Sequence, residues 1–251
     1  MKLIIDAVSD KGIVRNSNED MILVGNDCLR DASKNYEFDF TTYEFPFMIA
    51  VADGLGGHKG GAYASEIVQK KMASTVNQLP LNLKQSVIKS YFIASVQSIH
   101  QCILDEGNIN FEVRGMASTF SGVLFYGTKI FLTHVGDSRI YHFSKGKLTR
   151  FSRDHSLQEL KGNNGALRTA IVNAFGAPEV FLDFEEITAK LQNDDLILIC
   201  TDGLSKELSD TEITNCLSQP NCHIKLIDEA KKAGGNDNIS IAVIRYIKNW
   251  Q

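Results

Sequence analysis

Short apolar runs separated by polar segments make up much of the chain, and two longer segments carry their apolar residues at helical spacing. The runs at residues 3–8, 21–24 and 47–52 have the length and the β-branched content of strands. Over residues 68–79 and 88–103, apolar residues recur every three or four positions, which predicts two amphipathic helices. These helices are expected to pack on the core, and we assign them no chemistry.

Short strands dominate from residue 117 onwards. The stretches STFSGVLFY, KIFLTHVG, SRIYHF and KLTRF are joined by the short connections GT, GD and SKG, which are typical of antiparallel strands rather than βαβ crossovers. The apolar run DDLILICTDGL is followed by two predicted helices, at 210–217 and 223–233. A closing strand is predicted within GGNDNISIAVIRYI.

Two further segments lack a clear period. We interpret residues 26–43 as a loop or an irregular hairpin, and residues 153–175 as a polar flap with a short helix. Strands at both ends and in the middle, with helices in two pairs, favour an α+β fold in which two stacked antiparallel sheets carry helices on their outer faces. With 251 residues, no repeats and no Pro-rich linker, one domain over residues 1–251 is expected.

Composition narrows the classes of function. The 26 basic and 30 acidic residues give a net charge of −4, which argues against a nucleic-acid-binding protein with a broad basic face. No apolar run approaches the roughly 18 residues of a membrane span, and the first residues do not resemble a signal peptide, so a cytoplasmic protein without a membrane partner is expected. The five cysteines form no CxxC pair, which argues against a disulfide framework or a zinc site.

Acidic residues recur beside the apolar strands. They lie in the motifs NED (Glu19, Asp20), ADG (Asp53), TDG (Asp202) and GGNDN (Asp237). Any one such aspartate, taken alone, is best explained as part of a turn or a helix cap. If the strand ends converge, however, so many close carboxylates would repel one another and take up protons unless a multivalent cation neutralised them.

Ligands that are all oxygens select hard ions such as Mg²⁺ or Mn²⁺. A carboxylate shared by two such ions would hold them about 3.5 to 4 Å apart with a water between them. The two ions would lower the pKa of that water toward neutrality. The pattern therefore indicates hydrolytic chemistry. Metal-dependent nucleases also use two ions, but the chain has no basic clusters that would bind nucleic acid.

Seven stretches point to a known family by their order along the chain, namely SDKGIVRNSNED, VADGLGGHKGGAYAS, GMASTFSG, HVGDSRIY, RDHS, CTDGL and GGNDNIS. Together they resemble the metal-dependent protein phosphatases of type 2C in their compact bacterial form, over nearly the whole chain. The resemblance implies an α-β-β-α sandwich, a centre of two Mn²⁺ or Mg²⁺ ions, and hydrolysis of phosphoserine and phosphothreonine. It also implies phosphoprotein substrates, with a bacterial serine/threonine kinase and its targets as natural partners.

The resemblance assigns ligand roles residue by residue. Asp53 matches the carboxylate that bridges the two ions, and Gly54 matches the residue whose backbone carbonyl is a ligand. The other ligands are carboxylates, with Asp202 and Asp237 at the first ion and Glu19 and Asp20 at the second.

Two more residues match the family pattern, and each has a plain alternative. Arg15 matches the arginine that grips the substrate phosphate, a task that suits a guanidinium because it donates two parallel hydrogen bonds and stays charged. The alternative is an ordinary surface arginine. Asp137 matches a ligand of a weaker third ion, and its alternative is a turn aspartate between two strands.

The chain also departs from the family pattern. Lys206 stands four residues after Asp202, where many relatives carry an acidic ligand of the third ion, so binding of a third ion is left open. Leu55 occupies the position of a histidine that acts as a general acid in some relatives, and His58 is a weaker candidate for proton transfer. We interpret the remaining histidines as structural, including His155 at the start of the flap.

The flap at 153–175 is shorter than in most relatives, and segment 26–43 is longer and is a candidate docking surface. A catalytically weak family member that binds phosphoproteins without cleaving them is the main alternative to an active phosphatase. The presence of all the expected ligands, and of Arg15, counts against that alternative.

Overall fold

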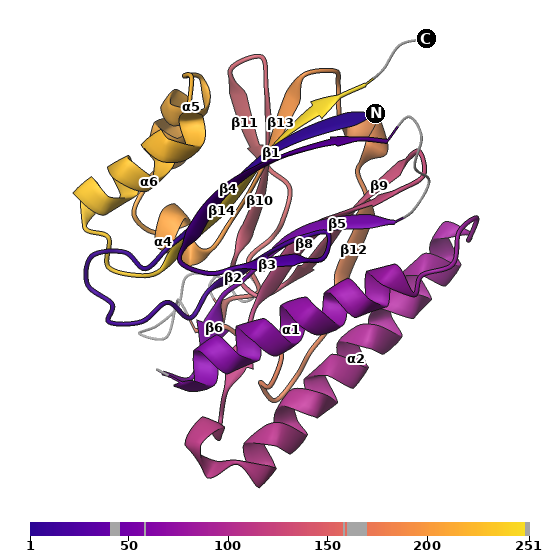
Figure 1. Ribbon diagram of the computed structural model, residues 1–251, viewed down its shortest axis with the longest axis vertical. Coiled ribbons are helices and arrows are strands. Elements are labelled where there is room, and N and C mark those ends of the chain that lie inside the picture. The colour runs from indigo at the N-terminus through magenta and orange to yellow at the C-terminus, as the bar shows by residue number, and fades with distance from the viewer. Residues whose placement is uncertain (41–45, 58, 158, 160–169, 249–251) are drawn as a thin grey trace.

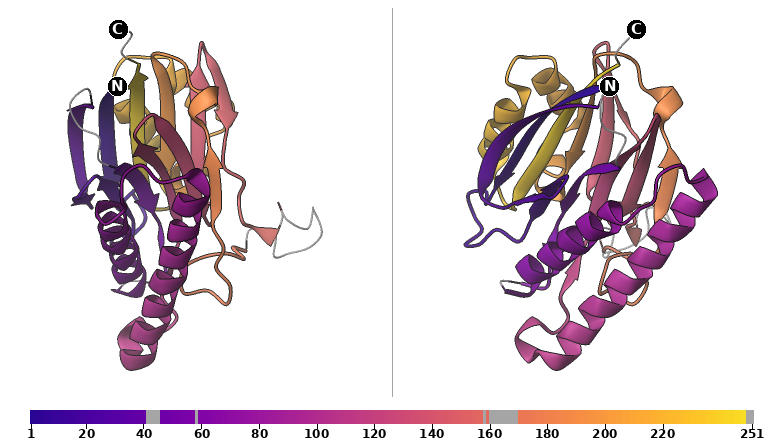
Figure 2. Two further views of the ribbon diagram at one scale, coloured as in Figure 1. Left: turned by 90° about the vertical axis from the view of Figure 1, so that its right-hand side faces the viewer. Right: turned by 45° about the vertical axis from the view of Figure 1, so that its right-hand side comes forward.

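Two six-stranded antiparallel sheets are packed face to face, and helices cover the outer face of each sheet (Figure 1). The structure is a computed structural model that describes residues 1–40, 46–57, 59–157, 159 and 170–248. Figure 2 shows the same layers from two further sides. The predicted α+β class, with its α-β-β-α layers, is confirmed.

The first sheet, called here the β1 sheet, contains strands from the two ends and the middle of the chain. Its order is β11 (Lys147–Arg150), β10 (Arg139–Ser144), β13 (Asp195–Cys200), β14 (Ile239–Ile247), β1 (Lys2–Asp10) and β4 (Ala32–Asp39). Its outer face is covered by α4 (Asp202–Ser205), α5 (Asp210–Leu217) and α6 (Cys222–Ala233). The capping box of Ser209 and Glu212 marks the start of α5.

The second sheet, called here the β5 sheet, takes three strands from residues 21–52 and three from residues 120–186. Its order is β12 (Asp183–Glu186), β9 (Lys129–Val135), β8 (Phe120–Tyr126), β5 (Phe47–Ala52), β2 (Met21–Val24) and β3 (Asp27–Leu29). The long helices α1 (Lys59–Asn77) and α2 (Gln85–Ile109) cover its outer face. The smaller elements are β6 (Gly54–Leu55), β7 (Ala117–Ser118) and the 3₁₀ helices η1 (Phe111–Val113) and η2 (Thr188–Lys190).

Strand β5 is apolar at every position and β13 is apolar from Leu196 to Cys200, because both faces of these strands are buried. In β5, Ile49 and Val51 face the β1 sheet, whereas Met48 and Ala50 face the helices α1 and α2. Strand β13 divides its residues between the two sides in the same way. Packing of two sheets with an apolar layer on each side requires such continuous apolar runs, and this is why the runs could be read as strands.

The interpretation of 26–43 as a loop or an irregular hairpin was wrong for most of the segment. It contains β3, which pairs with β2, and β4, which pairs with β1 at the edge of the β1 sheet. In β4 the half-buried Tyr36 and Phe38 alternate with exposed Asn35 and Glu37, so a period of two exists. Polar residues occupy so much of this edge strand that its alternation was hidden. Residues 41–45 lie outside the described part.

The predicted flap at 153–175 is described only at its two ends. Residues 155–157 and 170–172 pair through Leu157 N–H to Ala170 O at 3.0 Å and Val172 N–H to His155 O at 2.9 Å. The short helix predicted within the flap falls mainly on residues that are not described. Within the described residues, no helix has the length and apolar character needed to cross a membrane.

The layer between the sheets gives a stability prediction. Ile197 is fully buried there, so Ile197→Ala should lower the free energy of unfolding by about 2–5 kcal/mol through lost burial and a residual cavity. Urea denaturation followed by circular dichroism measures the change. Ile224 on α6 is half exposed, and Ile224→Ala should shift stability by no more than about 0.5 kcal/mol. Equal losses in the two variants would contradict the assignment of Ile197 to the core.

Candidate active site

Strand register brings the acidic motifs together in pairs. Asp20 precedes β2 and Asp53 follows β5, and these strands are antiparallel with Met21 opposite Ala52, so the two aspartates flank the same end of the β5 sheet. Asp202 follows β13 and Asp237 precedes β14, and the pairing of Cys200 with Ile241 places this second pair at one end of the β1 sheet. Antiparallel pairing is what allows motifs far apart in sequence to meet.

The two pairs meet because the chain crosses between the sheets at this end of the sandwich. The connection from β1 to β2 carries Arg15, Glu19 and Asp20, and the connection from β9 to β10 carries Asp137. Thr201 Oγ1, beside Asp202, donates to Asp20 Oδ2 at 2.8 Å and so ties the pairs to each other. The structure therefore brings together the carboxylates that the sequence singled out.

Glycines allow the segments around Asp53 to approach closely. A Cβ on Gly54 would lie 2.6 Å from the carbonyl oxygen of Glu19 and would overlap that of Gly61. A Cβ on Gly61 would overlap the Glu19 carboxylate and would lie 2.6 Å from the backbone carbonyl oxygen of Gly54. Real Cβ atoms do not tolerate such contacts, so both positions require glycine. The glycines at 54 and 61 thus let the backbone segments beside Asp53 come close to one another.

Three carboxylates of the site are buried in a way that an ordinary turn does not explain. One oxygen on each of Asp20, Asp137 and Asp202 is buried and has no hydrogen-bond partner among the described residues. Burial raises the pKa of Asp20 well above its usual range despite the hydrogen bond from Thr201. Burial and then the charges of Asp202 and Asp20 do the same for the pKa of Asp53. Burial, with the charge of Asp202, raises the pKa of Asp137 to about 7.

Two cationic side chains offset part of this negative charge. Arg15 Nη2 donates to Asp237 Oδ2 at 2.8 Å, and that hydrogen bond raises the arginine pKa. Lys206 Nζ forms an ion pair with Asp202 Oδ2. Burial by itself would lower the pKa of Lys206, but the net direction is upward because of the charge of Asp202, with smaller contributions from Asp137 and Asp53.

The donor set fits a hard divalent ion that keeps part of its water shell. In the described residues, no three Asp, Glu, His or Cys side chains form a ready-made metal site. Mg²⁺ sites of the kind that serve phosphate chemistry, however, use one or two carboxylates, several waters and the substrate phosphate rather than a complete protein cage. The unpartnered oxygens of Asp20, Asp137 and Asp202 are acceptors that a cation or its waters would satisfy.

Several supporting residues were not predicted from the sequence. The Asn238 side chain accepts from Glu19 N–H at 2.8 Å and donates to Lys11 O at 2.9 Å and Ser17 O at 3.0 Å, so it fixes the β1–β2 connection. Thr119 Oγ1 accepts from Asp53 N–H at 3.0 Å. Asn238 directly follows Asp237 in GGNDN, and that adjacency was the available signal. Nothing in the sequence marks Thr119 as the partner of Asp53.

The described histidines make their contacts away from the clustered carboxylates of Asp20, Asp53, Asp202 and Asp237. His58 lies outside the described residues. His155 is buried, its Nε2 donates to Asp183 Oδ2 at 3.0 Å, and its Nδ1 accepts from Gly136 N–H at 3.1 Å, which holds the turn before Asp137. This arrangement agrees with the structural role expected for His155.

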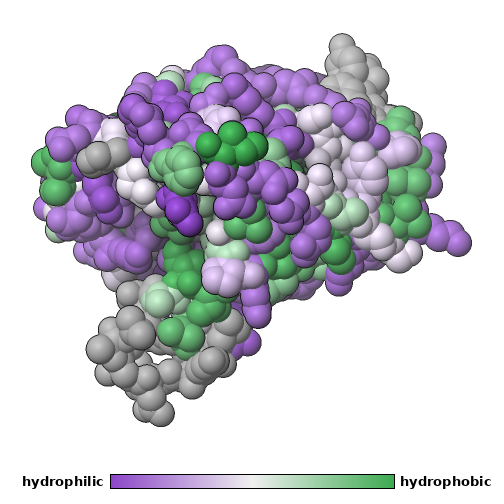
Figure 3. All heavy atoms as spheres, turned by 90° about the horizontal axis from the view of Figure 1, so that it is seen from below, coloured by the Kyte–Doolittle hydropathy of each residue, from purple (hydrophilic) through white to green (hydrophobic). Residues whose placement is uncertain are grey.

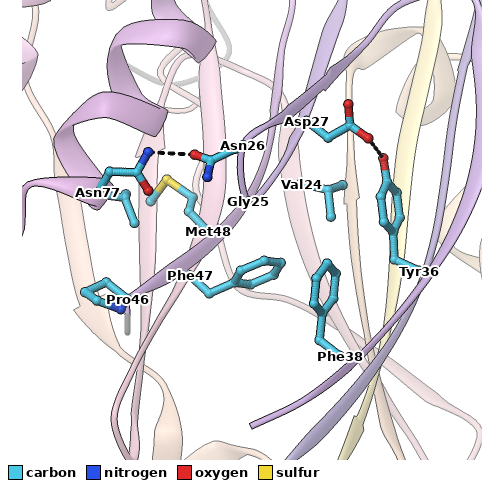
Figure 4. Close-up of a pocket in the computed structure, with 11 residues that line it drawn as sticks. Val24, Gly25, Asn26, Asp27, Tyr36, Phe38, Pro46, Phe47, Met48 and Asn77 are labelled. Carbon is cyan, nitrogen blue, oxygen red and sulfur yellow. Dashed lines mark hydrogen bonds between the residues drawn. The ribbon is translucent and has the colours of Figure 1, made fainter. Parts of the chain in front are cut away.

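A separate pocket of about 410 Å³ lies beside the β2–β3 turn and the end of α1 (Figure 4). Its walls are largely apolar, with Phe38, Phe47 and Met48 facing the space. Its acidic group, Asp27, accepts from Tyr36 Oη at 2.7 Å and pairs with Lys34, and the bonds from Lys34 and Tyr36 lower the pKa of Asp27. A carboxylate satisfied in this way offers no reactive group, so the pocket is not the candidate active site.

Known proteins resemble this chain in sequence and in fold. The family model for Protein phosphatase 2C matches residues 27–232. The serine/threonine protein phosphatase PstP of Mycobacterium tuberculosis is 29% identical over 253 residues, covering 94% of this chain but only 44% of PstP. The S. agalactiae serine/threonine phosphatase structure has a TM-score of 0.80 and 25% identity, covering 98% of this chain and 100% of that chain. The PstP catalytic domain in complex with two manganese ions has a TM-score of 0.75 and 26% identity, covering 99% of this chain and 100% of that chain.

The raised pKa of Asp137 gives a prediction for metal-free protein. The pKa of Asp137 is about 7 in the folded protein and 3.8 in its ordinary state, so the folded protein binds the proton more tightly than the unfolded chain does. The free energy of unfolding should therefore fall as the pH rises from about 4 to about 7. Asp137→Asn cannot ionise and should be more stable than wild type at pH 7.5 by on the order of 1–3 kcal/mol. Urea denaturation in chelator at pH 5 and pH 7.5 measures this. The control Asp228→Asn, on the exposed face of α6, should lose as much stability as wild type between pH 5 and pH 7.5. A loss of the same size in Asp137→Asn would contradict the prediction.

Proposed function

We infer that this chain, which belongs to the protein phosphatase 2C family, hydrolyses phosphoserine and phosphothreonine in proteins with the help of divalent ions. One observation carries the inference. Acidic residues from four separate motifs meet at one end of the sandwich, and three carboxylates there keep a buried oxygen without a partner among the described residues. Such a cluster would hold protons at neutral pH unless cations neutralised it.

The residues that would hold the ions are those of the cluster and its neighbours. They are the side chains of Glu19, Asp20, Asp53, Asp202 and Asp237 and the backbone carbonyl of Gly54. Bound Mn²⁺ or Mg²⁺ would supply a water of lowered pKa and positive charge toward the phosphate. The protein's own part is to orient these ligands. Asn238 and Thr119 do so by fixing the backbone at Glu19 and Asp53.

Arg15 has the position and chemistry to bind the substrate phosphate. It lies at the rim of the cluster, half exposed, and its hydrogen bond to Asp237 aims the guanidinium at the carboxylates. A guanidinium has five N–H donors, so others remain for phosphate oxygens. A phosphoserine or phosphothreonine entering the site would therefore meet a positive charge at the rim before it meets the carboxylates.

Two ions are proposed rather than three. Lys206 is tethered to Asp202 and is close enough to Asp137 and Asp53 for their charges to raise its pKa. Its ammonium supplies positive charge close to Asp137 and Asp202, and it would repel a third ion that approached these carboxylates. In the relative PstP, the catalytic domain has been solved in complex with two manganese ions, which supports the proposal of two ions.

The proposed substrates are phosphorylated proteins, including a serine/threonine kinase and its targets. The names of the relatives support the substrate class but not the kinase. Residues 1–251 are proposed to act as one catalytic domain, and the cytoplasmic location remains a prediction from the sequence.

Phosphate release from two substrates tests the function. A phosphothreonine peptide and a bis-phosphodiester are each incubated with the protein in Mn²⁺ and in chelator. We expect turnover of the peptide in Mn²⁺ only, and calorimetry should count two Mn²⁺ ions per chain. Cleavage of the diester alone would indicate a nuclease. Peptide binding without turnover would indicate a phosphoprotein-binding module.

Substitution of the proposed bridging ligand should nearly abolish activity. Asp53→Asn keeps the shape but removes the charge, and it should lower kcat for the phosphothreonine peptide by about a thousandfold or more. Steady-state kinetics at saturating Mn²⁺ measures the loss. Asp105→Asn, on the exposed surface of α2, is the matched control and should retain wild-type kcat. A loss of less than tenfold in Asp53→Asn would remove Asp53 from the reaction.

Arg15→Ala should lower kcat/KM for the peptide by about 10- to 150-fold, because one charge-assisted contact with phosphate is lost. Arg15→Lys should recover only part of the loss, since a point charge lacks the planar fork. Inhibition by inorganic phosphate should weaken in parallel, and calorimetry should show Mn²⁺ affinity nearly unchanged. Wild-type kcat/KM and unchanged phosphate inhibition in Arg15→Ala would make this residue an ordinary surface arginine.

A further inference from the structure

Two large apolar residues are exposed next to Arg15. Ile13 and Val14 have 63% and 60% of their surface exposed, and neither belongs to the three hydrophobic clusters that form the core. They lie in residues 11–17 of the β1–β2 connection, called here the Arg15 loop. Their side chains therefore have no role in covering the core.

The Arg15 loop is anchored along its length. Ile13 N–H and Val14 N–H both donate to Gly235 O, at 2.9 and 3.3 Å, and Asn238 Nδ2 holds the carbonyl oxygens at both ends of the loop. Gly12 has a positive φ of 79°, and a Cβ there would overlap the Asp237 carbonyl oxygen. The two apolar side chains are thus presented to solvent from a fixed backbone rather than from a mobile tip.

Single exposed apolar residues are common on protein surfaces and by themselves need no explanation. The face of the molecule seen from below shows that apolar residues do reach the surface, where they lie among polar ones (Figure 3). Ile13 and Val14 differ in three respects. They are adjacent to each other, they are held rigidly, and the next residue is the proposed phosphate-binding arginine.

We propose that Ile13 and Val14 form a specificity-determining surface for the polypeptide substrate, which receives an apolar side chain close to the phosphorylated residue. The proposal rests on the proposed function, since it takes the phosphate to lie beside Arg15. An extended peptide advances about 3.3 Å per residue. Side chains one or two positions from the phosphoresidue are therefore the ones that would reach the residues adjacent to Arg15.

The expected size of the preference follows from the area available. Complete burial of an isoleucine or valine side chain favours binding strongly, but only the exposed part of each can be covered by a substrate. A leucine in the peptide that covers this part should raise kcat/KM by about 5- to 10-fold over serine at the same position. The preference should appear mainly in KM, because the contact is remote from the reacting phosphate.

A set of peptides and variants tests this. Phosphothreonine peptides carry either leucine or serine at positions −2, −1, +1 or +2 in an otherwise constant sequence, and kcat/KM is measured for each pair in Mn²⁺. The double variant Ile13→Ser/Val14→Ser is compared with wild type and with Val87→Ser. Val87 is the control because it is also apolar and 47% exposed but lies far from the Arg15 loop. It stands near the start of α2, and that end of α2 is at the right of Figure 1, whereas the β1–β2 connection is at the left.

We expect at least one position where wild type and Val87→Ser prefer leucine by about 5- to 10-fold and where the double variant shows a ratio near 1. Equal ratios in all three proteins, or no preference in wild type, would overturn the proposal. Dimerisation of wild type that the double variant abolishes, seen by light scattering, would also overturn it, because the surface would then face a second copy. Absence of phosphate release from every peptide would instead refute the proposed function.

Discussion

Burial of the central strands on both faces is the constraint on which the rest of the structure depends. Because β5 and β13 are covered by a sheet on one side and helices on the other, residues 47–52 and 196–200 in them are all apolar. Polar chemistry can therefore begin only where these strands end. The crossing of the chain between the two sheets at that end then brings four strand ends, and their aspartates, into one cluster.

The same burial sets the electrostatics of the cluster. Carboxylates at the end of a closed apolar sandwich are partly shielded from water, so their mutual repulsion is strong and the pKa values of Asp20, Asp53 and Asp137 rise. Arg15 and Lys206 reduce the repulsion from the rim without filling the buried interior of the cluster. A site with these properties is prepared for cations before any substrate arrives.

The sequence was informative where local pattern and burial coincide. Strands β2 and β5 and helix α5 were predicted with their observed bounds. Their apolar positions and the polar motifs beside them together fix where each element begins and ends. Strand β4 was missed, because an edge strand with half-buried aromatic residues looks like a polar loop. The acidic motifs were identified as a group, but the Arg15 to Asp237 bond joins residues 222 positions apart and has no local signal. The roles of Asn238 and Thr119 likewise depend on tertiary contacts.

The position of β14 in its sheet has a consequence for biosynthesis. It is the last strand in the described part of the chain, yet it lies between β13 and β1 and forms the longest pairing of that sheet with the first strand. A nascent chain on the ribosome cannot join β1 to β13 until β14 has emerged, and Asp237 and Asn238 arrive only with it. Catalytic competence should therefore appear only once β14 has emerged, and a chain interrupted before β14 would carry no premature activity toward the proteins around it.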